Sequence, residues 1–164
     1  MTHRTLIILR HGKSDYPAGV ADHERPLASR GLREAAEAGE WISNHVGKVD
    51  LVLCSTATRT RETFARTTID APVEYLAELW ASSHLDYLAA VREYGGDAKT
   101  LLIVGHEPSV SATALELASD RTTPAARAIE RKYPTSGIAV LRTKQEWADL
   151  ETGHSDLHEF HAPH

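Results

Sequence analysis

The chain has 164 residues, of which 41% are hydrophobic and 25% are charged, close to the average for soluble globular proteins. This length suits one hydrophobic core, so we expect a single domain over residues 1–164. Lys and Arg total 18 against 23 Asp and Glu, which gives a formal net charge of −5. Because no basic stripe could follow a phosphate backbone, the composition argues against nucleic acid as a partner.

The apolar segments of the chain are short. The first apolar run, Leu6 to Leu9, is too short for the core of a signal peptide, and no stretch approaches the roughly 18 apolar residues of a membrane span. The single cysteine, Cys54, cannot form an internal disulfide and lies in an apolar run, as a buried thiol would. We therefore expect a cytoplasmic protein with no membrane partner.

Apolar spacing along the chain predicts strands that alternate with helices. Uninterrupted β-prone runs predict buried strands and an extended segment, at residues 5–9, 49–54, 73–75, 100–104 and 137–142. Helical spacing predicts helices at residues 32–46 with Ser29 as the cap, after the Ser55-Thr56 turn, at 84–94 and at about 110–118. Residues 147–150 are expected to pair with the last strand at a sheet edge. This alternation predicts a three-layer α/β/α sandwich with a mostly parallel central sheet.

Polar side chains follow three of the predicted strands. Arg10-His11 follows the first, Ser55 through Arg59 the second, and His106 the third. The carboxyl ends of parallel strands meet at one edge of a sheet, where ligands commonly bind. Two guanidinium groups and two imidazoles in a chain of net negative charge point to an anion, and the planar fork of arginine suits a phosphoryl group. The sequence therefore predicts a phosphate site at this edge.

Neutral imidazole is a competent nucleophile in phosphoryl transfer near pH 7. A lone histidine at a strand end is more often a capping or solvated residue, but His11 lies among the other predicted phosphate ligands. Attack requires one ring nitrogen to face the phosphorus, so we expect the other to donate to a backbone carbonyl. Gly12 would let the backbone approach the substrate.

Several segments in order carry a resemblance to a known family. They are residues 9–14 (Leu-Arg-His-Gly-Lys-Ser), Arg25-Pro26-Leu27 with Gly31, residues 55–59 with Glu62-Thr63, residues 76–79 and residues 104–108. Together they resemble the histidine phosphatase (phosphoglycerate mutase-like) superfamily. The short chain without a long insertion is similar to the SixA-type phosphohistidine phosphatases.

The resemblance implies a phosphoglycerate mutase-like fold and a phosphohistidine intermediate on His11. It also implies that Arg10, Arg59 and His106, together with Gly12, bind the phosphoryl group, and that neither a metal nor another cofactor is needed. Thr56 departs from the family pattern, because many relatives have proline after the serine.

The proton donor has two candidates. Glu78 occupies the place of the acid found in mutase-like members, which makes it the predicted catalytic acid, and Asp22 is the reserve. SixA-type enzymes need such an acid less, because a phosphoramidate leaving group departs more easily than an alkoxide.

Two further features have a structural and a functional interpretation. Arg25 either pairs with a surface carboxylate or contacts the substrate, and we include it among the substrate-binding residues. Four histidines near the end of the chain invite a metal hypothesis, at positions His154, His158, His161 and His164. Their spacing matches no standard closed site, so we expect a polar tail and no metal.

The predicted function is hydrolysis of a phosphohistidine or a phosphomonoester through a covalent intermediate on His11. The preferred substrate is a phosphorylated protein, because a chain of this length leaves little room for a domain that would enclose a small metabolite. One alternative is a small-molecule phosphatase acting on sugar phosphates or nucleotides, and another is a non-catalytic module that binds phosphorylated partners. A monomer and a homodimer both remain open.

Overall fold

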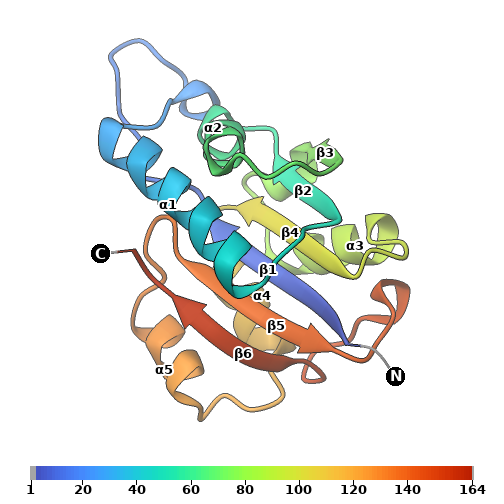
Figure 1. Cartoon of the computed structure of the whole chain (residues 1–164). Coiled ribbons are helices and arrows are strands. Elements are labelled where there is room, and N and C mark those ends of the chain that lie inside the picture. The colour runs from blue at the N-terminus through green and yellow to red at the C-terminus, as the bar shows by residue number, and fades with distance from the viewer. Residues whose placement is uncertain (1–2, 164) are drawn as a thin grey trace.

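The computed structural model describes residues 3–163, in which six strands form one sheet in the order β3-β2-β4-β1-β5-β6 (Figure 1). The strands are β1 (Arg4–Arg10), β2 (Leu51–Ser55), β3 (Val73–Leu76), β4 (Thr100–Gly105), β5 (Ile138–Thr143) and β6 (Asp156–His161). The α-helices are α1 (Ser29–His45), α2 (Thr58–Thr67), α3 (His84–Tyr94), α4 (Ser109–Leu117) and α5 (Pro124–Arg131). Three short 3₁₀ segments are η1 (Asp22–Glu24), η2 (Ala77–Leu79) and η3 (Trp147–Asp149).

The sheet is mixed but mostly parallel. Strands β3, β2, β4 and β1 are parallel neighbours, whereas β5 runs antiparallel to β1 and β6 antiparallel to β5. Helices α1 and α2 cover the face turned toward the viewer in Figure 1, and α3, α4 and α5 lie behind it. The predicted three-layer α/β/α architecture is therefore confirmed.

Strand β1 shows why the sheet needs a helical layer on each face. Its successive side chains point to opposite faces, as the pleat requires. Ile7 and Leu9 pack with Ile42 of α1 in one core cluster, whereas Leu6 and Ile8 pack in a second cluster with residues of α3, α4 and α5. All four β1 residues are buried, so the uninterrupted apolar run reflects a strand covered on both faces.

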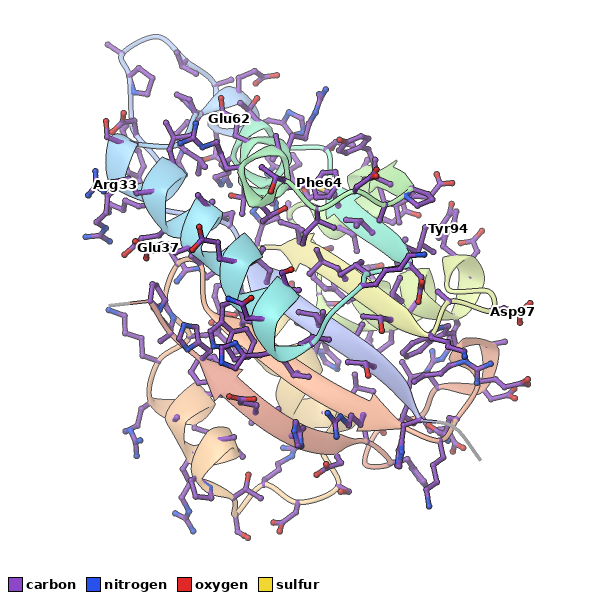
Figure 2. The ribbon with its side chains drawn as sticks, in the orientation of Figure 1. Arg33, Glu37, Glu62, Phe64, Tyr94 and Asp97 are labelled. Atoms are coloured by element: carbon purple, nitrogen blue, oxygen red, sulfur yellow. The ribbon has the colours of Figure 1, made fainter. Side chains whose placement is uncertain are left out.

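The same architecture brings the three predicted strand ends to one edge of the sheet. Strand β1 ends at Arg10, β2 at Ser55 and β4 at Gly105, and all three are parallel. The segment 12–28 is tied to helix α2 beside this edge. The amide of Gly12 donates to Thr63 Oγ1 at 2.9 Å, and the amide of Leu27 donates to Glu62 Oε1 at 2.7 Å. Figure 2 labels Glu62 on α2.

The sequence prediction was wrong for two segments near the end of the chain. Residues 147–150 form no strand, because η3 directs Trp147 into the core, where its indole N–H donates to the carbonyl of Ala98 at 2.6 Å. The antiparallel partner of β5 is β6, which lies in the segment predicted to be a polar tail.

Two helix assignments also need correction. Helix α5 was not predicted, although Thr123 caps it by accepting the amide of Ala126 and proline occupies its first turn. Ser29 is the first helical residue of α1 rather than its cap, a place held by Ala28. Within residues 3–163, no helix has the length and apolar character to cross a membrane.

Gly31, in the first turn of α1, lies where the helix packs closely against the segment after β1. A Cβ on Gly31 would lie 2.1 Å from the carbonyl oxygen of Lys13, so the backbone must shift to accept it. We predict that Gly31→Ala lowers the free energy of unfolding by about 1–3 kcal/mol in urea titrations. Ser29→Ala, at an exposed position without a side-chain cap, should stay within about 0.5 kcal/mol of the wild type. Equal effects of the two substitutions would contradict this packing.

Candidate active site

His11 follows β1 at the carboxyl edge of the sheet, and its side chain is buried. Its Nδ1 lies 2.7 Å from the carbonyl oxygen of Gly12. A carbonyl only accepts hydrogen bonds, so Nδ1 carries the hydrogen and Nε2 keeps a free lone pair when the ring is neutral. This is the backbone contact that the sequence analysis required of a nucleophilic histidine.

His106 follows β4 and faces His11, with 5.2 Å between the ring centroids. Its Nε2 lies 2.8 Å from Ser55 Oγ, which also accepts the amide of Ala57 at 3.2 Å. Because the Ser55 oxygen is already an acceptor, its own hydrogen can go to Nε2 of His106. That arrangement places the hydrogen of neutral His106 on Nδ1, an atom that is buried and has no protein partner.

The backbone of His106 is held by a buried tyrosine. The Tyr87 hydroxyl accepts the amide of His106 at 2.9 Å and donates to the carbonyl of Leu79 at 2.9 Å. Burial, above all, raises the pKa of Tyr87 well above its ordinary value, so the phenol keeps its hydrogen and remains a donor. Strand β4 and helix α3 thus position the second histidine together.

Arg10 and Arg59 supply positive charge to the same place. Arg10 Nη1 donates to the carbonyl of Tyr133 at 2.8 Å, and Arg59 Nη1 donates to the carbonyl of Asp22 at 2.8 Å. In both guanidinium groups the Nε atom is buried and has no protein hydrogen-bond partner, as is also true of Nδ1 of His106. Buried N–H groups are rarely left unpaired, so these three, from the end of β1, the first turn of α2 and the residue after β4, indicate donors for a ligand.

Asp22 and Arg25 form the border of this cluster. Asp22 Oδ2 lies 3.3 Å from Arg59 Nη2, and its Oδ1 accepts from Arg25 Nε at 2.9 Å. Arg25 also donates to Ser14 Oγ at 2.8 Å, and its guanidinium lies 3.9 Å from the ring centroid of Tyr16. The hydrogen bond from Arg25, followed by the charge of Arg59, lowers the pKa of Asp22. Both interpretations of Arg25 therefore have a structural basis: it pairs with a carboxylate and lies next to the arginine cluster.

Glu78, the predicted acid, lies in η2 and is exposed. The pKa of Tyr94 is raised first by the charge of Glu93 and also by the charges of Glu78 and Glu74. The carboxylate that contacts the arginine cluster is instead that of Asp22.

Gly12, predicted to approach the substrate, has its amide paired with Thr63, and a Cβ on it would lie 2.9 Å from the carbonyl oxygen of Gly31.

Burial and positive neighbours keep both active-site imidazoles neutral. Burial is the largest cause that lowers the pKa of His11, to about 4. The hydrogen bond to the Gly12 carbonyl comes next and opposes it, and the charges of Arg10, Arg59 and Arg25 lower the pKa further. Burial, followed by His11 and Arg59, lowers the pKa of His106 to about 3. Near pH 7 His11 therefore presents a lone pair to an anion that the arginines attract.

A family model for the histidine phosphatase superfamily, branch 1, matches residues 6–143, which includes every strand end described above. The chain belongs to this superfamily. An uncharacterized protein of Mycobacterium tuberculosis is 52% identical over 157 residues, covering 94% of this chain and 99% of that protein.

Solved structures of the superfamily extend the similarity to the whole fold. A protein of Nakamurella multipartitia assigned as the phosphohistidine phosphatase SixA is 38% identical, with a TM-score of 0.92 over 99% of this chain and 98% of that one. A protein of Agrobacterium tumefaciens with the same assignment is 26% identical, with a TM-score of 0.81 over 98% of both chains. This member of the histidine phosphatase superfamily thus has a SixA-like structure.

Several residues around the site were not among the predicted functional residues. Ser55, Tyr87 and Thr63 act through hydrogen bonds to His106 and Gly12, and only Ser55 and Thr63 lie in segments that the family resemblance includes. The sequence did not mark Tyr87 as a functional residue, because a tyrosine at helical spacing is ordinarily a core residue. The side chain of His23 lies beside Thr56 and Trp80 and was not among the predicted residues.

The described histidines of the chain's last segment engage separate partners. His154 Nδ1 lies 2.8 Å from the carbonyl of Thr152, His158 lies 3.9 Å from Asp156, and His161 stacks on Trp41. Residues 3–163 contain no cluster of three or more His, Cys, Asp or Glu side chains suited to a metal. His164, the fourth histidine of the metal hypothesis, lies outside the described residues.

The low pKa values of His11 and His106 predict a specific pH dependence of stability. Both folded-state values lie below the ordinary 6.5, so protonation favours the unfolded chain. The stabilisation from the neutral rings is complete above pH 6.5 and is lost as the pH falls toward 4. We predict that the free energy of unfolding falls over this range less steeply in a His11→Gln/His106→Gln variant than in the wild type. Urea titrations at stepped pH measure both slopes, and equal slopes would contradict the assigned pKa shifts.

Proposed function

We propose that the protein is a phosphohistidine phosphatase that transfers the substrate's phosphoryl group to His11 and then to water. The observation that carries this proposal is the set of three buried nitrogens without protein partners, on Arg10, Arg59 and His106, around a histidine with a free Nε2. A phosphoryl group has three equatorial oxygens that need such donors.

In the first step, Nε2 of His11 attacks the phosphorus and the bond to the leaving group breaks. Arg10, Arg59 and Nδ1 of His106 donate to the equatorial oxygens, where negative charge gathers in the transition state. The Gly12 carbonyl, 2.7 Å from Nδ1 of His11, stabilises the positive charge that develops on the attacking ring.

In the second step, water attacks the phosphorus of phosphohistidine and the bond to Nε2 breaks, which returns the lone pair to His11 and releases phosphate. The same donors bind the oxygens in both steps, so the site need not rearrange. The two guanidinium groups provide the positive charge that metal ions provide in other phosphatases, and we propose that the reaction needs no metal.

The proposed substrate is a phosphohistidine on a partner protein. Support comes from the similarity to the Nakamurella protein, which covers nearly all of both chains. Neutral phosphoramidates can take a proton on the leaving nitrogen, so the reaction depends less on a strong carboxylic acid, in keeping with the pairing of Asp22 to two arginines.

Replacement of the nucleophile and of one phosphate ligand tests the proposal. We predict that His11→Gln lowers phosphate release at least about 1000-fold and that Arg59→Lys lowers it about 100-fold, because lysine cannot reproduce the guanidinium fork. The matched controls are His154→Gln and Arg61→Lys, which change the same residue types at exposed positions. Phosphate release by purified His11→Gln at the wild-type rate would refute the proposal, as would a complete loss of wild-type activity with EDTA.

The substrate class needs its own comparison. We predict that kcat/KM for a phosphohistidine-bearing protein exceeds that for sugar phosphates and nucleotides by at least about tenfold, because only the former has a leaving group that is readily protonated. A panel assayed for phosphate release under one condition measures the ratio. A higher value for any metabolite would assign the protein to the small-molecule phosphatases instead.

A further inference from the structure

His23 in η1 lies at the border of the active site and contacts two other parts of the chain as well as its neighbour Glu24. Its Nε2 lies 3.0 Å from Thr56 Oγ1, and its ring meets Trp80 edge-on with 4.8 Å between centroids. Its Nδ1 lies 3.5 Å from the carboxylate of Glu24. The side chain is 32% exposed, so it is positioned by these contacts and still reaches solvent.

The neighbours of Thr56 and of His23 in the sequence connect this group to the phosphate ligands. Thr56 follows Ser55, whose hydroxyl bonds His106, and Asp22, which precedes His23, binds Arg59 through its carbonyl and its carboxylate. Among the charged groups near this turn, Glu24 lies 3.5 Å from the ring, Arg59 of α2 binds the neighbouring Asp22, and the charge of His23 acts on His106 at the end of β4. Burial and then several nearby charges, His23 among them, lower the pKa of His106, so the two rings share one electrostatic environment.

The proposed reaction needs a group that exchanges a proton with the leaving atom. His11 and His106 are buried and neutral, and Asp22 is held in its ionised form by Arg25 and Arg59. Histidine is the side chain whose charge changes most readily near neutral pH. Thr56 matters here because a proline at its position would have no hydroxyl to hold the imidazole.

We propose that His23, positioned by Thr56 and Trp80, is a catalytic residue that donates a proton to the leaving group and later accepts one from water. This inference rests on the proposed phosphatase function and adds its acid and base. It assigns to His23 the role that the sequence analysis gave to Glu78.

The proton balance is complete within the site. As the bond from His11 Nε2 to phosphorus forms, the bond from phosphorus to the leaving oxygen or nitrogen breaks and its electron pair stays on the leaving atom. That atom takes a proton from the His23 imidazolium. In hydrolysis, the attacking water gives a proton to the now neutral His23 while the bond from Nε2 to phosphorus breaks.

A series of aryl phosphates with increasingly poor leaving groups tests this role. We expect His23→Gln to lower kcat/KM about 100-fold for the poorest leaving group, and within about threefold for p-nitrophenyl phosphate, whose leaving group departs without a proton. Thr56→Val should change kcat/KM in the same pattern to a smaller extent, because it removes only the hydroxyl that holds the ring. His154→Gln is the control at an exposed histidine, and Glu78→Gln tests the rival donor.

The outcomes separate this inference from the proposed function. If His23→Gln lowers kcat/KM equally across the series or not at all, His23 is not the proton donor, although the phosphatase proposal stands. If Glu78→Gln shows the leaving-group dependence instead, the role returns to Glu78. If the wild type hydrolyses none of the aryl phosphates and forms no phosphohistidine on His11, the proposed function itself fails.

Discussion

The hydrogen bond between Nδ1 of His11 and the carbonyl of Gly12 is the constraint on which the rest of the site depends. At 2.7 Å it determines which ring nitrogen carries the hydrogen, and so leaves Nε2 as the free nucleophilic atom. The bond requires the chain to turn immediately after β1. That turn is stabilised by the amide of Gly12 on Thr63 and by the close approach of Gly12 to the backbone of Gly31.

Electrostatics explains why the two histidines are buried together beside arginines. In water, an imidazole is partly protonated near neutral pH and loses its lone pair to the proton. Burial and the surrounding guanidinium groups disfavour that proton at His11, while the same charges attract a phosphoryl dianion. In the proposed reaction, one set of charges therefore keeps the nucleophile reactive and binds its substrate. The cost is a pair of desolvated rings whose protonation in acid favours the unfolded chain.

Much of this arrangement could be predicted from the sequence, because its signals are local. The β-prone runs before Arg10, Ser55 and His106 are continuous, and parallel strands deliver their carboxyl ends to one edge. Helix α5 and strand β6 were missed. Strand β6 is polar and half exposed, and it derives its stability from pairing with β5. For Glu78, a motif gives the place of the residue along the chain, whereas its contacts depend on tertiary packing. His23 was missed because its partners, Thr56 and Trp80, lie far away in the sequence.

The most direct test of this account is a search for the covalent intermediate on His11. The protein is mixed briefly with a phosphoryl donor and quenched without acid, since phosphohistidine is acid-labile, and intact masses are compared for the wild type and His11→Gln. The account predicts a phosphoryl adduct on the wild type that is absent from the variant. An adduct that persists in His11→Gln, or phosphate release by the wild type with no adduct at any mixing time, would contradict it.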